Sequence, residues 1–527
     1  MTFRLGSPDT SLTMDRRRFL EGSTALGVAG ALGTMSGPAM AAEPKKGGRL
    51  RVALAEGSTS DTLDPQTYTD IYMISVGFAT HSTLTEISPE GDLVGDAAES
   101  WEGSDDASAW TFRIREGVTF SDGKKLTAED VIASIQHHRG EDSKSAAKDL
   151  VTPIAEMTKV DDRTVTFVLD GPNADFPYLM ADYHLLMMPA TEGGKVDWEN
   201  YIGTGGYVLE SFEPGVRTVM KRRPDYWKEG RAHFDELELL YVADVVARQN
   251  AVATGEVDMM SRVDLKTVGL LKRRPGLRVE EATGFLHYTA PMLTQSAPYD
   301  NVELRRAIKH SLDREELVSK ILRGHGALGN DHPIAPSVPF HNATLPQRVQ
   351  DLDKAKFHLK KAGYSGEELV LSAADAAYAG AVDASILMQE QLAKAGINMR
   401  VDRVPNDGYW SNIWLKKPWC ACYWGGRPTC DWMFTQAYAS GASWNDTQFE
   451  HERFNMLLSA GRAETDPLKR AEIYGEMQQI VSDDGGAVVW GFANYVYAMA
   501  DKVQHGPDVA ANWALDGGRY VERWWFA

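Results

Sequence analysis

Strand-like and helix-like patterns of hydrophobic residues alternate along most of the chain. Short runs rich in branched and aromatic residues, or with strict alternation, are typical of strands. A longer alternating run returns near the C-terminus. The pattern predicts strands at residues 49–55, 110–116, 164–170, 216–222, 237–242 and 487–500.

Capping residues mark where several helices begin. Thr127 and Asp130 have the spacing of a capping box, Asp300 or Asn301 can cap a second helix, and Asp313 can cap a third. Amphipathic runs follow these residues and recur later in the chain. Together they predict helices at residues 131–138, 302–312, 314–323, 449–462 and 466–484.

Residues 369–404 read as a β-α-β unit. A strand at 369–373 is followed by an amphipathic run at 379–396 and by an alternating strand at 397–404. Such a unit predicts a right-handed crossover in a largely parallel sheet. No segment repeats with a period of 20 to 50 residues, so a solenoid or propeller is excluded. We expect a mixed α/β protein.

The N-terminus predicts a targeting segment. Arg16, Arg17 and Arg18 precede a short apolar run that ends in the small-x-small sequence at residues 39–41. The apolar run is far shorter than the ~20 residues needed to span a bilayer. We expect residues 1–41 to form a signal peptide that resembles a twin-arginine signal, rather than a buried helix, with Met1 or Met14 as the start.

Length and charge narrow the class of protein. With 527 residues, the chain is long enough for several lobes, and its 43% hydrophobic content is that of a globular protein. The formal net charge of -19 repels phosphate backbones and anionic membrane surfaces. We therefore expect no nucleic-acid partner.

The three cysteines lie close together, at Cys420, Cys422 and Cys430. An oxidising compartment permits at most one disulfide among them. Cys420 and Cys422 are poorly placed to bond each other, so Cys430 is the better partner for either, and three free thiols are the alternative. No CxxC or Cys/His spacing accompanies them, which argues against a metal site.

Four stretches carry a resemblance to a known family. They are LDPQTYTD (63–70), the block GDLVGDAAESW to LTAEDV (91–131), GTGGYVLESFEPGVRTVMKRRPDYW (203–227) and VELRRAIKHSLDREELVSKILRGHG (302–326). The chain resembles the extracytoplasmic solute-binding proteins of peptide and nickel ABC transporters, family 5, over nearly its whole mature length. Gly206 replaces the proline that is usual in the third block.

The resemblance implies an α/β, two-lobed periplasmic-binding-protein fold of the large cluster C type, with an extra subdomain in the first lobe. Residues 42–288 and 489–527 would form lobe I, and residues 289–488 lobe II. The family closes its lobes on a peptide or small-molecule ligand and passes it to ABC permease subunits in the inner membrane. It also implies a periplasmic monomer with no cofactor.

The stretch YWGGRPTCDW, at residues 423–432, departs from the family pattern. Trp424, Gly425 and Gly426 match, but Arg427 stands where peptide-binding relatives have an aspartate that pairs with the peptide's amino terminus. A guanidinium suits a carboxylate, and Asp431 can take an ammonium. This predicts a site for an anionic or zwitterionic solute, unless Arg427 and Asp431 simply neutralise each other.

Other residues fall where relatives have cleft-facing loops or crossings between lobes. Each of them is also compatible with a place in the core. The additional ligand-binding candidates are His81, His287, Tyr288, Trp410, Trp444 and Asn445.

A hydrolase and a metal-chelate carrier are the rival functions for this sequence. A hydrolase is disfavoured because there is no GxSxG elbow and because His451-Glu452 lacks the second histidine of a zinc motif. A nickel or metal-chelate carrier is the alternative within the family, although the thirteen histidines are scattered and His137-His138 lies on a predicted helix. We expect a binding protein that is not an enzyme; a sensory accessory role would share the same fold.

Overall fold

The computed structural model describes residues 44–406 and 408–527, and all elements below belong to these ranges. The predicted signal peptide at residues 1–41 and the choice between Met1 and Met14 as the start lie outside the described residues.

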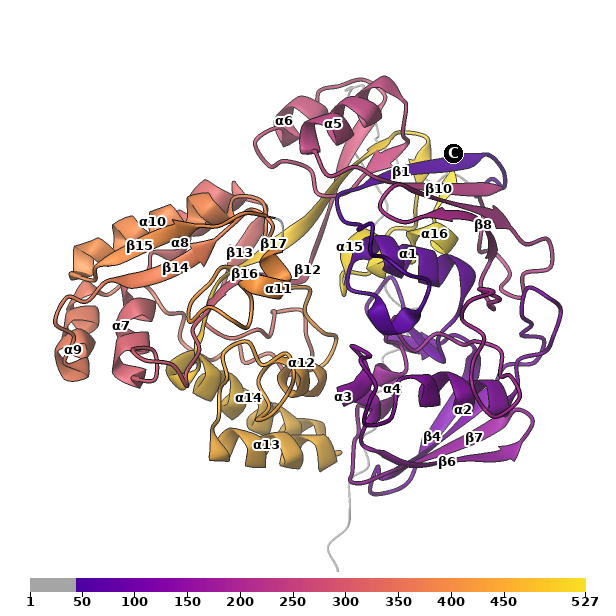
Figure 1. Ribbon diagram of the computed structural model, residues 1–527, viewed down its shortest axis with the longest axis horizontal. Coiled ribbons are helices and arrows are strands. Elements are labelled where there is room, and N and C mark those ends of the chain that lie inside the picture. The colour runs from indigo at the N-terminus through magenta and orange to yellow at the C-terminus, as the bar shows by residue number, and fades with distance from the viewer. Residues whose placement is uncertain (1–43, 407) are drawn as a thin grey trace, which may run out of the picture. The chain divides into compact units, whose positions relative to one another are not determined.

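The largest sheet joins strands from both halves of the chain (Figure 1). Within the described residues it has nine strands, eight of them in one continuous order, while β13 (Gly326–Leu328) pairs with β17. The order is β16 (Cys422–Trp424), β12 (Leu277–Pro291), β17 (Ala487–Ala500), β11 (Met259–Met260), β1 (Arg49–Leu54), β10 (Glu236–Tyr241), β9 (Arg217–Arg222) and β8 (Tyr207–Glu213).

The long strands β12 and β17 pair antiparallel over most of their lengths. Their register shifts between Thr283 and His287 and again between Tyr288 and Thr289. Such irregularities bend a strand and add local twist. The predicted lobe boundaries at 288/289 and 488/489 fall inside these two strands, and they stay a prediction.

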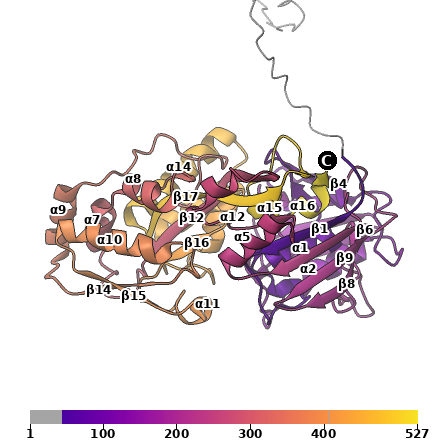
Figure 2. The ribbon, with the colours of Figure 1, turned by 90° about the horizontal axis from the view of Figure 1, so that it is seen from above.

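The β-α-β unit forms as predicted, but the parallel sheet around it does not. β14 (Leu369–Ala373) and β15 (Met399–Arg403) pair in parallel, and α10 (Ala381–Ala395) packs on them (Figure 2). Parallel pairing in the large sheet is confined to β1, which lies between β10 and β11. The expectation of a largely parallel sheet was therefore wrong, because all other neighbouring strands of the large sheet pair antiparallel in the described residues.

Smaller sheets and strand pairs complete the β structure. They are β4 (Ala98–Gly103), β5 (Ala109–Ile114), β7 (Thr164–Leu169) and β6 (Ile154–Asp161) in one antiparallel sheet, β2 (Thr85–Ile87) with β3 (Leu93–Gly95), and β18 (Val503–Gln504) with β19 (Trp525–Phe526).

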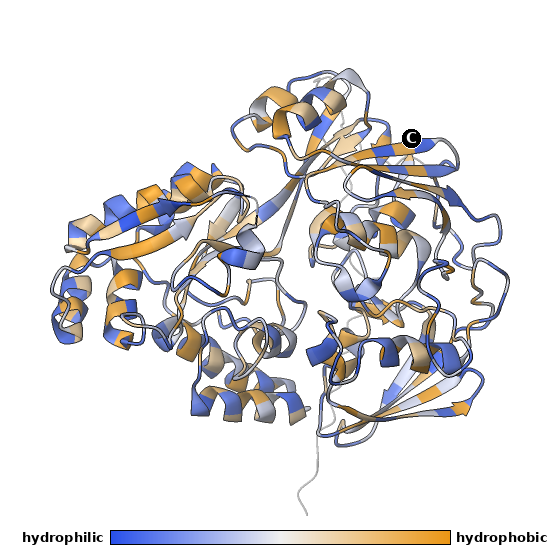
Figure 3. Cartoon of the chain, in the orientation of Figure 1, coloured by the Kyte–Doolittle hydropathy of each residue, from blue (hydrophilic) through white to orange (hydrophobic). Residues whose placement is uncertain are grey.

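Most predicted helices form, and their caps act as expected. Thr127 and Asp130 make the reciprocal capping box, and Asn301 caps the helix that follows it. Hydrophobic and hydrophilic residues share the surfaces of the outer helices (Figure 3). The α-helices are α1 (Ile71–Thr80), α2 (Ala128–His137), α3 (Lys148–Val151), α4 (Phe176–Leu179), α5 (Val245–Thr254), α6 (Val268–Leu271), α7 (Val302–Ser311), α8 (Arg314–Leu317), α9 (Leu352–Ala362), α11 (Tyr409–Asn412), α12 (Cys430–Ala437), α13 (Glu452–Ala463), α14 (Pro467–Asp484), α15 (Ala514–Gly517) and α16 (Tyr520–Arg523), besides α10.

Two segments are helical in another form. Pro65–Thr67 (η1) is a 3₁₀ turn, and Val318–Leu322 (η2) continues α8 as a π-helix. Arg323 then adopts a left-handed conformation with φ of 52°. The predicted helix at 314–323 thus changes type midway and ends one residue early.

All three cysteines are buried free thiols. The thiol of Cys422 donates to the carbonyl of Tyr423, and the thiol of Cys430 donates to the carbonyl of Pro339. Of the two alternatives that the sequence left open, the structure therefore has the three free thiols and no disulfide of Cys430.

Among the described helices, none is both long and apolar enough to cross a membrane.

Candidate functional site

The Trp424–Arg427 loop begins where β16 ends, on the edge of the large sheet. Trp424 pairs with His287 of β12, and the backbone turns at Gly426 with φ of 76°. A Cβ atom on Gly426 would lie 2.1 Å from the Cβ atom of Phe285, so only glycine fits there. The carbonyl of Gly425 accepts a hydrogen bond from the hydroxyl of Tyr495 at 3.2 Å. The sequence thus places Arg427 on a closely packed turn.

Arg427 is a buried guanidinium, only 5% exposed. Its Nε donates to Gln436 Oε1 and its Nη1 donates to the carbonyl of Gly426, both at 2.6 Å. The guanidinium carbon lies 6.0 Å from the ring centre of Trp424 and 5.7 Å from that of Trp432. Within the described residues it has no carboxylate partner within 4 Å. Its hydrogen bonds are therefore to neutral groups, and its charge also acts on the buried carboxylate of Asp182.

Asp431 does not neutralise Arg427. Its Oδ1 accepts from Arg462 Nε at 3.1 Å, and burial raises the pKa of its carboxyl although Arg462 opposes that rise. A narrow cavity of about 20 Å³, lined by Asp431, Trp432 and Arg462 among others, adjoins the pair. The alternative of an Arg427–Asp431 ion pair is thus not realised, and the charge of Asp431 is already engaged.

A cluster of aromatic rings extends from Trp424. Trp414 lies 6.2 Å and Trp444 5.9 Å from it between ring centres, and these two rings are 6.0 Å apart. Trp410 is 41% exposed and meets Tyr423 edge-on at 5.5 Å. The predicted site residues Trp410, Trp424 and Trp444 all lie in this cluster, which also contains Trp414 and Tyr423, two residues that were not candidates from the sequence.

His287 is fully buried, beside the Trp424–Arg427 loop. Its Nδ1 lies 3.0 Å from the carbonyl of Phe285, whereas Nε2 has no hydrogen-bond partner among the described residues. Burial lowers the pKa of His287 to about 4, and the nearby charge of Arg427 acts in the same direction. The ring is therefore neutral at pH 7, and its Nε2 is a free acceptor.

Tyr288 faces the other side of β12. It stacks on Tyr378 with ring centres 4.0 Å apart. Tyr288 pairs with Tyr423 of β16, and the guanidinium carbon of Arg262 lies 5.3 Å from the ring centre of Tyr423. Arg262 Nη2 forms an ion pair of 2.6 Å with Glu56 Oε1. Arg262 has a φ of 48°, a strained conformation for a residue with a side chain. No sequence signal marked Arg262.

Two predicted site residues are held by structural bonds instead. His81 ends α1, is buried, and shares a hydrogen bond of 2.8 Å with Thr80 Oγ1. The side-chain amide of Asn445 donates to the carbonyls of Ala439 and Phe449, which closes a turn. Burial lowers the pKa of His81 to about 3. The oxygen of the Asn445 side chain also accepts from Thr447 Oγ1 and from the amide of Phe449, so this side chain has no polar atom to spare for a ligand.

Asp70 is a site candidate that sequence reasoning missed. It caps α1 by accepting from the amides of Tyr72 and Met73. Burial, together with the nearby charges of Glu56 and Asp61, raises the pKa of Asp70 to about 7. Asp70 and Arg427 both influence the hydroxyl of Tyr183, so both act on one region. Its only signal in the sequence was its place at the end of LDPQTYTD.

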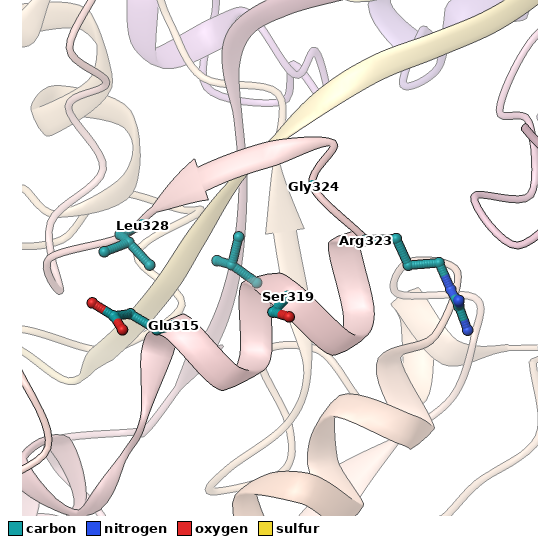
Figure 4. Close-up of a pocket in the computed structure, with 6 residues that line it drawn as sticks. Glu315, Ser319, Arg323, Gly324 and Leu328 are labelled. Carbon is teal, nitrogen blue, oxygen red and sulfur yellow. The ribbon is translucent and has the colours of Figure 1, made fainter. Parts of the chain in front are cut away.

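A hollow of about 640 Å³ lies elsewhere, open to solvent (Figure 4). It is lined by residues of α8, η2, β13 and the turn at Gly324, and by none of the predicted site residues. We do not assign it to ligand binding. In the described part of the chain, no three His, Cys, Asp or Glu side chains are grouped to hold a metal ion.

Comparisons with known proteins show the family to which the chain belongs. Residues 92–446 match the model of the family described as bacterial extracellular solute-binding proteins, family 5 middle. The probable D,D-dipeptide-binding periplasmic protein DdpA of Escherichia coli K12 is 27% identical over 484 residues, 86% of this chain and 90% of that protein. The glutathione-binding protein GsiB of Salmonella typhi is 25% identical over 472 residues, which cover 87% of this chain and 90% of GsiB.

Solved structures show the same fold. AgaA of A. tumefaciens R10, in complex with agropinic acid, superposes with a TM-score of 0.80 at 23% identity, covering 91% of this chain and 99% of AgaA. DppA of Helicobacter pylori, in complex with the peptide STSA, gives the same score at 22% identity and the same coverage. The predicted α/β, two-lobed periplasmic-binding-protein fold is confirmed.

Proposed function

Because the chain belongs to family 5 of the bacterial extracellular solute-binding proteins, we propose that it captures an anionic or zwitterionic organic solute for an ABC importer. Members of this family bind peptides or other small ligands outside the cytoplasm and work with ABC permeases. A short peptide and an opine-like or other small polar metabolite are the solutes that we propose for this chain.

The observation that carries this proposal is that Arg427 is buried without a carboxylate in direct contact among the described residues. Taking a guanidinium out of water is costly unless an opposite charge or strong hydrogen bonds replace the lost hydration. Arg427 is 95% buried, yet in the described residues it has only an amide oxygen, a carbonyl and two indole faces. A ligand carboxylate supplies the missing charge and can accept two parallel bonds from the guanidinium.

Asp70 is the better candidate for the positive end of a zwitterion. The ion pair with Arg462 engages Asp431, whereas Asp70 has only backbone amides as hydrogen-bond donors and no basic side chain within 4 Å in the described ranges. We propose that Arg427 receives the carboxylate and Asp70 the ammonium. Trp424, Trp410 and Tyr423 would cover the solute between these two ends.

Lobe closure would bring these two ends together. Residues assigned to lobe I and lobe II are in direct contact: Asp175 pairs with Arg470 at 2.7 Å, and Asp149 accepts from Ser443 Oγ at 2.6 Å. The irregular register near His287 in β12 provides a place where the crossing strands can bend. We propose that the protein works as a periplasmic monomer, exported through the twin-arginine pathway.

Mass spectrometry of the solute that co-purifies with the protein tests the proposal. We expect an organic acid or zwitterion, bound in equal molar amount, that is absent from protein carrying Arg427→Met. Arg400→Met is the matched control, because Arg400 is half exposed and pairs with Glu368 on the surface. A cationic or neutral solute, retained by the Arg427 variant, would contradict the proposed preference.

Elemental analysis of the same preparation tests the alternative of a metal-chelate carrier. We expect no stoichiometric nickel, because the described residues offer no cluster of ligating side chains. Nickel bound in equal molar amount would replace our proposal with that alternative.

A further inference from the structure

Asp446 is a buried carboxylate without a positive partner. It is 3% exposed, and no Lys, Arg or His side chain of the described residues lies within 4 Å of it. Instead, its Oδ2 accepts hydrogen bonds from two indoles, Trp424 Nε1 at 3.0 Å and Trp414 Nε1 at 3.1 Å. An isolated buried carboxylate is costly, so its retention needs an explanation.

One oxygen atom thus fixes two rings of the aromatic cluster. Trp414 and Trp424 meet at 69° with centres 6.2 Å apart, and both contact Trp444. The hydrogen bonds fix the rotation of each indole, which packing alone leaves less well defined. Trp424 is also one of the two rings that face the guanidinium of Arg427. The carboxylate of Asp446 therefore contacts the indole of Trp424, and this indole contacts the guanidinium of Arg427. We call these consecutive contacts the Asp446–Trp424–Arg427 series.

The negative charge of Asp446 and the positive charge of Arg427 both favour the contact between Arg427 and the ring of Trp424. A cation is attracted to an aromatic face by the negative potential of that face. A carboxylate that accepts the indole N–H polarises the ring further in the same sense, because hydrogen bonds in a low-dielectric interior polarise one another. Asp446 therefore acts on Arg427 through the ring of Trp424.

We propose that Asp446 is a positioning residue for ligand binding, which holds Trp424 and Trp414 so that the guanidinium of Arg427 stays aimed at its ligand. This inference rests on the proposed role of Arg427 in ligand binding. Asp446 itself touches no ligand in this scheme; it acts by way of the indoles.

The ionisation of Asp446 can be followed by a pH titration, because the ionisable groups around it do not titrate in the same range. The ionisable groups that act on it are the thiols of Cys420 and Cys422 and the hydroxyl of Tyr438. Burial raises the pKa of all three, so they stay neutral near pH 7. Burial also raises the pKa of Asp446, to about 6, while the two indoles and the Cys422 thiol oppose the rise. Asp446 is therefore the member of this group that titrates in weakly acidic solution.

The first experiment uses the full chain without added solute and follows tryptophan fluorescence from about pH 4.5 to about pH 8. We expect a transition near pH 6 that Asp446→Asn abolishes. Arg427→Met should move its midpoint to higher pH, because the guanidinium favours the charged carboxylate. Asp402→Asn, at a surface residue of the same lobe, should change nothing. A transition that survives Asp446→Asn, or an unmoved midpoint in Arg427→Met, overturns the proposal.

The second experiment measures affinity for three probes: glutathione, a D,D-dipeptide and agropinic acid. For the probe that binds best, Asp446→Leu should weaken binding about tenfold relative to wild type. Asp446→Asn should bind within about threefold of wild type, because an amide oxygen still accepts both indole N–H groups. If Arg427→Met weakens binding and Asp446→Leu does not, the positioning role is wrong and the proposed function stands.

If Arg427→Met leaves the affinity unchanged, the proposed function fails instead. The affinities cannot be compared if the wild-type protein binds none of the probes or if Asp446→Leu does not fold. In these two cases the fluorescence experiment alone decides. In both, the loss of the transition in Asp446→Asn together with the shift in Arg427→Met supports the series of contacts, and the opposite result excludes it.

Discussion

Two buried arginines, Arg519 and Arg427, are almost equally hidden from solvent, at 3% and 5% exposure, but their surroundings differ. Arg519 lies within 3.0 Å of carboxylate oxygens of Glu86, Asp96 and Glu522. Arg427 has no carboxylate within 4 Å among the described residues and lies between indole rings.

The difference separates scaffold from site. A buried charge whose partners all belong to the chain is satisfied in every state of the folded protein, so it can only stabilise or specify the fold. A buried charge without such partners lowers the stability of the empty protein and gains most when a ligand brings the counter-charge. Arg519 fits the first case and Arg427 the second.

The largest effect is expected from Arg519→Met. Removing the guanidinium leaves Glu86, Asp96 and Glu522 with Lys228 and Arg523 as the remaining cations within 4 Å among the described residues. Removing one partner of a buried ion pair costs ~3–5 kcal/mol. Chemical denaturation should show this loss in the free energy of unfolding. Arg453→Met, at an exposed pair with Glu476, is the control and should cost less than ~1 kcal/mol.

If Arg519→Met proves as mild as Arg453→Met, the ion network contributes little and the contrast with Arg427 loses its basis. Low pH checks the same network. Burial alone would raise the pKa of Glu522, but Lys228 and Arg519 hold it down at about 2. A depressed carboxylate pKa gives stability that is present above the ordinary value and lost as the pH falls towards 2. Arg519→Met should flatten this loss.

The next effect is expected from Arg427→Glu, which should weaken binding of the co-purifying solute by ~2 kcal/mol or more, because a carboxylate then faces a carboxylate. Isothermal titration calorimetry measures the change. The milder Arg427→Met breaks no ion pair, so it should lower the stability of the empty protein less than Arg519→Met does, by no more than the loss of its hydrogen bonds to Gln436 and Gly426. Unchanged affinity in both variants would exclude the role of Arg427 in binding.

A smaller effect is expected from Asp175→Asn, at the contact between the two predicted lobes. Arg470 is then left buried over Phe340 and Tyr474 without its carboxylate partner. We expect a loss of ~1–2 kcal/mol in solute affinity through faster release, because the contact forms only when the lobes meet. Stopped-flow release rates measure it. A change in unfolding free energy alone would mean that the pair stabilises one lobe and plays no part in closure.

The smallest effect should appear in the pH dependence of binding. With its pKa raised to about 7, Asp70 is largely protonated at pH 6 and charged at pH 8. Only the charged form attracts an ammonium, so the affinity for a zwitterion should rise by up to about tenfold over this range. Asp70→Asn should remove the rise. An equal rise in wild type and variant would assign the pH dependence to another group.

Much of the fold could be predicted from local patterns. The capping box at Thr127 and Asp130 and the alternation at residues 487–500 each placed an element within a few residues of its observed bounds. These signals are local, because a cap satisfies amides one turn away and a strand alternates every second residue. The parallel sheet was wrongly predicted because strand order depends on partners that are distant in sequence.

The candidate site shows the same division. The position of Arg427 in the Trp424–Arg427 loop is visible in the sequence. The partner of Asp431 is not, because Arg462 lies 31 positions away on α13. Asp446 was marked only by its place in the segment SWND at residues 443–446, and Arg262 was not marked at all. Folding brought them to Trp424 and Tyr423.

The sequence by itself determined the family, the order of most elements and the place of Arg427 directly after the Gly425–Gly426 pair. Only the tertiary structure decided which charges are neutralised within the chain and which are not. The physical reason is that the cost of a buried charge depends on the groups a few ångströms away, and most of those groups come from elements far apart along the chain.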